Sequence, residues 1–247
     1  MNLLTFDSDG KLNEAAANII IGTVQTTPRA VLGLATGGTP VGIYKEVVRE
    51  HERGMISFRN AVSFNLDEYV NIPRDHSESY HSYMNQNLFD HIDLPASQRH
   101  IPDGNAVDLE AECRRYDALI EQSGQIDLQL LGLGHNGHIG FNEPAHALIR
   151  GTHIVDLAEE TREANARFFA SIDEVPRQAL TMGVGTILKA KKIMLVVKGQ
   201  DKADIVARAL QGPITTDVPA SLLQTHPNLI VLLDAPAASK LKLENRP

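Results

Sequence analysis

The 247-residue sequence predicts an α/β fold: a single doubly wound, Rossmann-like domain in which a mostly parallel sheet carries helices on both faces. Three observations support this prediction. Short apolar runs alternate with longer amphipathic stretches, several of the runs are continuously apolar, and no linker rich in Pro, Gly or Ser divides the chain. Continuously apolar strands are typical of a parallel sheet that is covered on both faces.

Six apolar runs are predicted as strands, and three amphipathic stretches are predicted as helices between them. The strands are expected at residues 30–35, 61–65, 126–134, 152–157, 192–197 and 228–233. The helices are expected at residues 39–54, 111–124 and 202–212. In an open α/β sheet, ligands bind beyond the carboxyl ends of the strands, where the strand order reverses. Functional residues are therefore expected directly after these runs.

The composition is that of an ordinary globular protein, with 43% hydrophobic and 22% charged residues. A net charge of −8 argues against anionic partners, so neither nucleic acid nor a membrane is expected as a partner. The start of the chain has no basic segment and no small-residue cleavage site. A single cysteine, Cys113, excludes an internal disulfide and is predicted to be structurally inert. These features together predict a cytoplasmic protein.

The first candidate motif is ATGGTP, residues 35–40, which follows the first strand run. Two adjacent glycines allow a ligand to approach the backbone closely, and free N–H groups at a helix start form an anion site. Thr36 and Thr39 add hydroxyl groups, and Pro40 suits a first helical turn. The motif matches neither a Walker loop nor GxGxxG. Two interpretations stay open: a phosphate site, or a tight turn capped by Thr39.

The second candidate motif is FNLDEYVNIP, residues 64–73. Asp67 and Glu68 stand at the end of a predicted strand, where a carboxylate can serve as a general base. The alternative is a pair of solvated loop acids. The residues alone do not decide between them.

The third candidate motif is GLGHNGHIGFNEP, residues 132–144, with His135 and His138 three positions apart. Zinc sites normally take three or four ligands, and the chain contains no HExxH or CxxC pattern. We therefore predict no metal here. The favoured interpretation is an imidazole that moves protons and is oriented by a carboxylate such as Glu143. The glycines that let the loop bend round one cavity are Gly134, Gly137 and Gly140.

Two cations outside these motifs are also candidates. Arg167 lies in the helical pattern TREANARFF, and Lys202 follows the strand run KIMLVV at a helix start. Taken singly, each is also compatible with an ordinary surface charge.

The combination of segments LATGGTP, FNLDEY, SESYHSYM, GLGHNGHIGFNEP, TREANARFF and ALTMGVGTIL closely resembles the glucosamine-6-phosphate deaminase family, from about residue 30 to residue 233. The resemblance implies a fold of the sugar isomerase type and a role in N-acetylglucosamine catabolism. It implies the conversion of glucosamine 6-phosphate and water to fructose 6-phosphate and ammonium. No cofactor is implied, and the partner is a small sugar phosphate. The related 6-phosphogluconolactonases share the fold but differ in sequence after the Gly-His pair.

The resemblance also implies roles for particular residues. Asp67 is implied as the base that moves the proton between C2 and C1, and His138 as the acid/base of ring opening. Asn136 and Glu143 are implied as supports of His138, which leaves His135 a bystander. The implied phosphate ligands are Thr36, Gly37, Gly38, Thr39, Arg167 and Lys202. Residues 153–182 are implied as a mobile lid on a single domain spanning residues 1–247.

Two departures from the longer family members affect these expectations. Those members carry Asp at the position of Asn136, so charge support for His138 is expected to come mainly from Glu143. They also bind N-acetylglucosamine 6-phosphate as an activator through cations near the lid, where this chain has His153 and Val155. No activation by that ligand is predicted, and a homo-oligomer is possible.

Two rival functions were considered. A lactonase of the same fold would use the phosphate site and a histidine base but would leave Asp67 without a role. A non-catalytic sugar-phosphate sensor would need a DNA-binding helix-turn-helix, and the roughly 25 residues before the first predicted strand are too few for one.

Overall fold

The main sheet has seven parallel strands in the order β1-β10-β9-β6-β2-β3-β5. The computed structural model describes residues 1–166, 169 and 171–242. The strands are β1 (Asn2–Phe6), β2 (Val31–Leu34), β3 (Val62–Asn65), β5 (Arg99–His100), β6 (Leu128–Leu131), β9 (Ile193–Val197) and β10 (Leu229–Asp234). Every residue of β2, β3, β6 and β9 is buried, because helices cover both faces of these strands. The predicted α/β fold with a mostly parallel sheet is confirmed.

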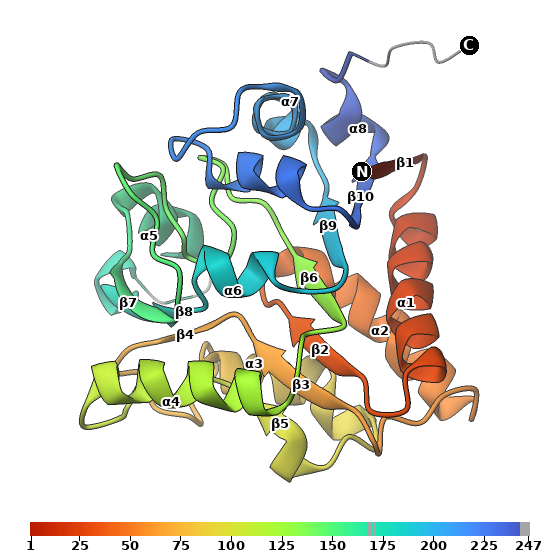
Figure 1. Cartoon of the computed structure of the whole chain (residues 1–247), viewed down its shortest axis with the longest axis vertical. Helices are drawn as coiled ribbons and strands as arrows, with labels where there is room; N and C mark the ends of the chain where they lie inside the picture. Colours follow the sequence, from red (N-terminus) through yellow and green to blue (C-terminus); the bar gives the residue numbers. More distant parts are fainter. Residues whose placement is uncertain (167–168, 170, 243–247) are drawn as a thin grey trace.

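The helices pack on both sides of the sheet, with α1 and α2 on one side and α4 and α6 on the other (Figure 1). They are α1 (Asp9–Thr26), α2 (Gly38–Glu52), α3 (Tyr80–Asn87), α4 (Leu109–Gln122), α5 (Glu159–Ala166), α6 (Val184–Leu188), α7 (Ala203–Gln211) and α8 (Ala235–Ala238). Short 3-10 helices are η1 (Phe89–His91), η2 (Ala96–Gln98), η3 (Ile172–Glu174), η4 (Gln200–Lys202) and η5 (Pro219–Thr225). Among the described residues, no helix combines the length and apolar character needed to cross a membrane.

The order of the strands places a switch point between β2 and β6. From β2 the chain continues to β3 on one side, and it later returns to β6 on the other side of β2. The loops that leave the carboxyl ends of β2 and β6 therefore diverge and open a crevice between them. These loops are the first and third motifs, residues 35–40 and 132–144.

A second, antiparallel sheet was not predicted. It consists of β4 (Asp67–Tyr69), β8 (Gln178–Thr181) and β7 (His153–Asp156), in the order β4-β8-β7. The strand predicted at residues 152–157 forms as β7, but it pairs with β8 rather than with the main sheet. Asp67 stands opposite Thr181 in this sheet. The segment predicted as a lid thus begins in β7 and ends just after β8, and β8 lies between β7 and the strand of Asp67.

Candidate active site

The loop at residues 35–39 leaves backbone N–H groups available at the start of a helix. α2 begins at Gly38, and its N-cap, Gly37, has a φ of 96° and no side-chain cap. That left-handed φ favours glycine. A methyl group added to either Gly37 or Gly38 would meet no atom within 4 Å, so the space above the loop is open. Such a helix start can bind an anion.

Two tyrosine hydroxyls donate hydrogen bonds to carbonyl groups of this loop. Tyr44 in α2 donates to the carbonyl of Ala35 at 2.6 Å, and Tyr83 in α3 donates to the carbonyl of Gly37 at 2.7 Å. In a trans peptide unit the N–H points opposite to the C=O. The N–H groups of Thr36 and Gly38 are therefore directed away from the tyrosines. Neither tyrosine was predicted to have a role, although Tyr83 lies in the segment SESYHSYM.

Asn136, His138 and Glu143 come together in the loop after β6, as the sequence predicted. Asn136 Nδ2 donates to Glu143 Oε2 at 2.6 Å, and Asn136 Oδ1 lies 2.7 Å from His138 Nδ1. Glu143 Oε2 is also 3.3 Å from His138 Nδ1. A carboxylate only accepts hydrogen bonds, so the Asn136 amide must turn its NH₂ to Glu143 and its oxygen to His138. Both partners of Nδ1 are then acceptors, which assigns the proton to Nδ1 and leaves Nε2 to exchange protons in the neutral ring.

Two glycines are required for this geometry. A methyl group added to Gly134 would overlap the His138 ring, so the imidazole lies directly against the Gly134 backbone. Gly137 has a φ of 94°, which favours glycine, and an added methyl group there would press against Val218. Gly140 also has a left-handed φ, of 57°, so the expectation that glycines bend this loop round one site is confirmed at all three predicted positions.

Glu143 is held as an anion by its neighbours. Burial raises its pKa, but hydrogen bonding and charge from His138, with hydrogen bonds from Thr161 and Asn136, outweigh burial and lower the pKa to about 2. The Thr161 hydroxyl donates to Oε1 at 2.5 Å. Glu143 therefore stays ionised across the neutral range.

Asp67 lies beside the same loop but in a different environment. Its side chain is 6% exposed, and a methyl group added to Gly140 would sit 3.6 Å from its Oδ2 atom. Burial, and secondarily the charge of Glu68, raise the pKa of Asp67 to about 8. A carboxylate with such a pKa is a strong base once it loses its proton.

Glu68 turns to the opposite face of β4 and accepts hydrogen bonds from three backbone N–H groups. The donors are Tyr69 at 2.9 Å, Tyr80 at 3.0 Å and His81 at 3.1 Å. Two of them belong to the first turn of α3, so Glu68 ties this helix to the strand of Asp67. The reading of Asp67 and Glu68 as solvated loop acids is wrong, because both side chains are buried.

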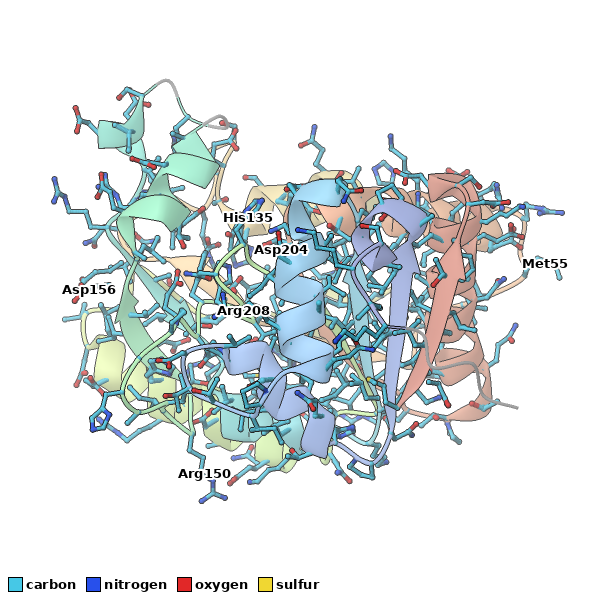
Figure 2. The ribbon with its side chains drawn as sticks, turned by 90° about the horizontal axis from the view of Figure 1, so that it is seen from above. Met55, His135, Arg150, Asp156, Asp204 and Arg208 are labelled. Atoms are coloured by element: carbon cyan, nitrogen blue, oxygen red, sulfur yellow. The ribbon has the colours of Figure 1, made fainter. Side chains whose placement is uncertain are left out.

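Of the two side chains predicted to bind phosphate as cations, the structure describes Lys202. Lys202, at the end of η4, donates from Nζ to the carbonyl of Leu133 at 2.9 Å, which places its ammonium group just beyond β6. Arg167 lies outside the described residues. His135 pairs with Asp201 at 2.6 Å, and both side chains are exposed. Figure 2 draws His135 near the amino end of α7, and its role as a bystander stays a prediction.

Cys113 is buried, and burial raises the pKa of its thiol to about 11, so the group stays protonated and unreactive as predicted. Within the described part of the chain, no three His, Cys, Asp or Glu side chains form a group that could hold a metal ion.

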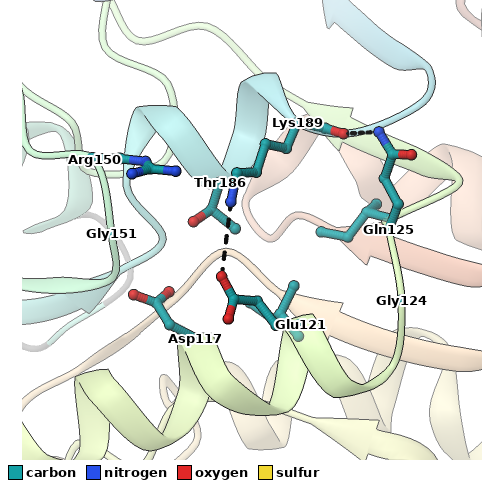
Figure 3. A pocket seen from close by; sticks show the side chains of 10 residues that line it. Asp117, Glu121, Gly124, Gln125, Arg150, Gly151, Thr186 and Lys189 are labelled. Atoms are coloured by element: carbon teal, nitrogen blue, oxygen red, sulfur yellow. Dashed lines mark hydrogen bonds and ion pairs between the residues drawn. The ribbon is translucent and has the colours of Figure 1, made fainter.

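A cavity of about 520 Å³ lies at the amino ends of the strands of the main sheet, next to the residues that precede β6. Asp117 and Glu121 of α4 form one wall, and Thr186 of α6 and Lys189 at its C-cap form the opposite wall (Figure 3). Glu121 and Lys189 approach to 3.8 Å across it. Because it lies at the amino ends of the strands, it is separate from the loops described above.

Known proteins resemble this chain over almost its whole length. It is 52% identical over 246 residues to the glucosamine-6-phosphate deaminase of Geobacillus sp. (strain WCH70), covering 100% of this chain and 98% of the relative. It is 50% identical over 239 residues to glucosamine-6-phosphate deaminase 1 of Bacillus subtilis (strain 168), covering 97% and 99% of the two chains. The solved structure of a monomeric glucosamine-6-phosphate deaminase matches with a TM-score of 0.95 at 50% identity, covering 98% of this chain and 100% of that one.

More distant structures share the fold alone. The 6-phosphogluconolactonase of Thermotoga maritima matches with a TM-score of 0.74 at 18% identity, covering 94% of this chain and 97% of that one. The sequence profile described as glucosamine-6-phosphate isomerases/6-phosphogluconolactonase matches residues 8–231. The profile match spans most of this chain. The relatives that share about half of its residues align with nearly its whole length. The chain therefore belongs to the glucosamine-6-phosphate isomerase/6-phosphogluconolactonase family.

Proposed function

We propose that this chain is a glucosamine-6-phosphate deaminase, which converts glucosamine 6-phosphate and water to fructose 6-phosphate and ammonium in amino-sugar catabolism. The identity of about half of all residues with proteins named for this activity supports the proposal. The observation that carries it is the arrangement of two carboxylates around one loop. Asp67 is a buried group with a raised pKa, and Glu143 is an anion held against His138.

Ring opening is the first proposed step and falls to His138. The Nε2 atom takes the proton of the anomeric hydroxyl and delivers a proton to the ring oxygen. Asn136 and Glu143 accept from Nδ1, which keeps the ring in the tautomer with Nε2 available. The negative charge of Glu143 stabilises the imidazolium that forms while the proton is in transit. This is the division of labour expected for a chain with Asn at position 136.

Proton transfer between carbons is the second proposed step and falls to Asp67. Its ionised carboxylate takes the proton from C2 to give an enolamine, and it returns a proton to C1. The resulting ketimine at C2 adds water and releases ammonia, so carbon oxidation states balance within the sugar and no redox cofactor is required. A base with a pKa near 8 is well matched to this transfer at neutral pH.

Phosphate binding is proposed at the 36–39 loop with Lys202 and Arg167. The open space above Gly37 and Gly38, and the position of the Lys202 ammonium group beyond β6, support it. Remote binding of this kind orients the reacting carbons without taking part in the chemistry. The 153–182 segment remains a proposed lid, and its two paired strands would confine any movement to residues 157–177.

The test is an endpoint assay in which purified, chelator-treated protein is incubated with glucosamine 6-phosphate, and ammonium and fructose 6-phosphate are measured separately. Equal amounts of the two products are expected. 6-Phosphogluconolactone is the control substrate, because its hydrolysis needs no carbon base. Hydrolysis of the lactone without release of ammonium would overturn the proposal, and so would a rise in melting temperature with the sugar phosphate but no turnover.

Regulation and assembly remain predictions. No activation by N-acetylglucosamine 6-phosphate is expected, because His153 and Val155 replace the cations of the longer members. A clear fall in the half-saturating substrate concentration on its addition would contradict this. The similar solved deaminase is described as monomeric, whereas a homo-oligomer stays possible for this chain, and sedimentation velocity distinguishes the two.

A further inference from the structure

The two oxygens of the Glu143 carboxylate are held by different parts of the molecule. Oε2 accepts from Asn136 Nδ2 at 2.6 Å and faces His138 Nδ1 at 3.3 Å, both within its own loop. Oε1 accepts from the hydroxyl of Thr161 at 2.5 Å, and Thr161 belongs to α5. One carboxylate thus joins the loop after β6 to the segment between β7 and β8.

The second hydrogen bond matters because the last torsion of a glutamate side chain is soft. That torsion has broad minima, so an anchor on one oxygen leaves the plane of the carboxylate free to turn. Donors on both oxygens fix the plane. Thr161 meets the need because its hydroxyl can donate while Glu143, as an anion, can only accept. Its side chain is also 6% exposed, so little water competes for the bond.

The position of Thr161 is set by its neighbour. Arg162 is 6% exposed, and its guanidinium donates to the carbonyl of Ile172 at 2.8 Å and towards that of Val175 at 3.5 Å. These bonds tie α5 to η3, which leads into β8. The Thr161 hydroxyl therefore follows the position of α5 relative to η3, and it transmits that position to the carboxylate.

We propose that Thr161 is a positioning residue, whose hydroxyl holds the Glu143 carboxylate in the plane in which it supports His138. This inference rests on the proposed function, since it takes His138 as the acid/base of ring opening. It goes beyond that function by assigning a role to α5 in the chemical step. Phosphate capture falls to other groups, so loss of this hydroxyl should affect turnover rather than substrate affinity.

The test compares two pairs of side chains that differ in the hydroxyl: Thr161 against Thr161→Val, and Thr161→Ser against Thr161→Ala. Within each pair we expect kcat to fall about tenfold when the hydroxyl is lost, as for a lost hydrogen bond to a charged group. KM should change less than twofold. If Thr161→Val fails to fold, the Ser and Ala variants still provide the comparison.

A structural role predicts a different pattern. If the hydroxyl only stabilises the segment, Thr161→Val should raise KM as much as it lowers kcat. If the methyl group of the side chain matters instead, Thr161→Ser should lose as much kcat as Thr161→Ala does. Either result overturns the inference, and so does an unchanged kcat in both pairs.

A second readout does not depend on turnover. The NMR resonance of the His138 Nδ1 proton should move in the Val and Ala variants and stay in place in the Ser variant. If the unaltered protein releases no ammonium, the proposed function fails, while this pattern would still uphold the positioning of Glu143. An Nδ1 resonance that ignores the hydroxyl would overturn the positioning even in an active enzyme.

Discussion

The strand β4 holds a buried carboxyl group and the loop after β6 a half-buried one at the same site, and the pKa values of the two groups are shifted in opposite directions. Burial and the neighbouring Glu68 raise the pKa of Asp67 to about 8. Glu143 is also penalised by burial, but donors from His138, Thr161 and Asn136 lower its pKa to about 2. The difference shows that burial alone does not set the state of a carboxyl group. The donors around it decide whether it stores a proton or a charge.

Two neighbouring carboxylates with separated pKa values divide acid/base work between them. At pH 7 roughly a tenth of Asp67 is ionised in the resting protein, and the ionised form is basic enough to take a proton from carbon. Glu143 stays charged and suits a purely electrostatic role. The predictions below test this division.

Asp67→Asn removes the base and should have the largest effect. We expect kcat to fall about 10³-fold, while the binding of inorganic phosphate stays almost unchanged, because the loop at 36–39 is not altered. Single-turnover kinetics and phosphate titration measure the two quantities. Retention of a tenth of the unaltered kcat would remove Asp67 from the base role.

Glu143→Gln keeps the shape of the side chain and removes its charge. The imidazolium of His138 loses its electrostatic support, so kcat should fall about 10²-fold, less than for Asp67→Asn. Ring opening can be bypassed by the open-chain fraction of substrate, and this limits the loss. If the two variants lost activity in the reverse order, the assigned roles would be exchanged. Asp201→Asn, at the exposed pair with His135, serves as the matched control.

Asp67→Asn and Glu143→Gln should shift the free energy of unfolding in opposite directions. The folded pKa of Asp67 lies above its ordinary value of 3.8, so the unfolded chain loses this proton first, and stability falls as pH rises from about 4 to about 8. Asp67→Asn avoids that cost and should raise the free energy of unfolding by about 2 kcal/mol at pH 7.5.

Glu143 has a folded pKa below its ordinary value of 4.5, so its contribution is present above about pH 4.5 and is lost as pH falls towards 2. Glu143→Gln should lower the free energy of unfolding by about 2 kcal/mol at neutral pH. Urea unfolding at pH 4 and pH 7.5 measures both variants, and the gain for Asp67→Asn should vanish at the lower pH. Shifts of the same sign at pH 7.5 would contradict the comparison.

Ionisation of Asp67 should also appear in the pH dependence of activity. We expect kcat/KM to rise about tenfold per pH unit below pH 8 and to level off above it. Ionisation of the substrate is common to all variants, so the ratio of the unaltered rate to the Asp67→Asn rate isolates this group. A ratio that is flat between pH 6 and pH 8 would place the pKa of Asp67 near its usual range.

Tyr83→Phe should have the smallest effect. It removes the hydroxyl that directs the Gly37 carbonyl away from the anion site, so KM and the phosphate dissociation constant should rise about fivefold with kcat unchanged. Tyr116→Phe loses a similar buried bond, to the carbonyl of Asn65 at 2.7 Å, and is the matched control. Phosphate affinity should fall in the first variant only; an equal fall in both would indicate a general loosening of the fold.

Local contacts made much of this site predictable. Asn136, His138 and Glu143 lie within eight residues of one another, so their meeting follows from the bend of one loop. The contacts of Tyr83 with Gly37 and of Thr161 with Glu143 span 46 and 18 residues. Such contacts depend on how elements pack, and a single sequence carries no period or spacing that reveals them.

The fold shows the same division. β2, β3, β6, β9 and β10 were predicted because burial on both faces, or nearly so, makes them predominantly apolar. β4 and β5 have only three and two residues, too few for a pattern, and β8 of the second sheet was missed with them. Without β4 and β8, nothing in the sequence indicated that β7 would join a separate sheet.

The outermost strand of the main sheet has a consequence for how the chain is made. Among the strands that the structure describes, β1, at residues 2–6, pairs with β10 alone, at residues 229–234. Synthesis proceeds at about 5–20 residues per second, so β1 waits on the order of ten seconds or more until its partner has been made. Until then its backbone is an open edge, which is a place where another chain can attach. In the cell, the pairing of β1 with β10 is therefore a late event in the assembly of this sheet.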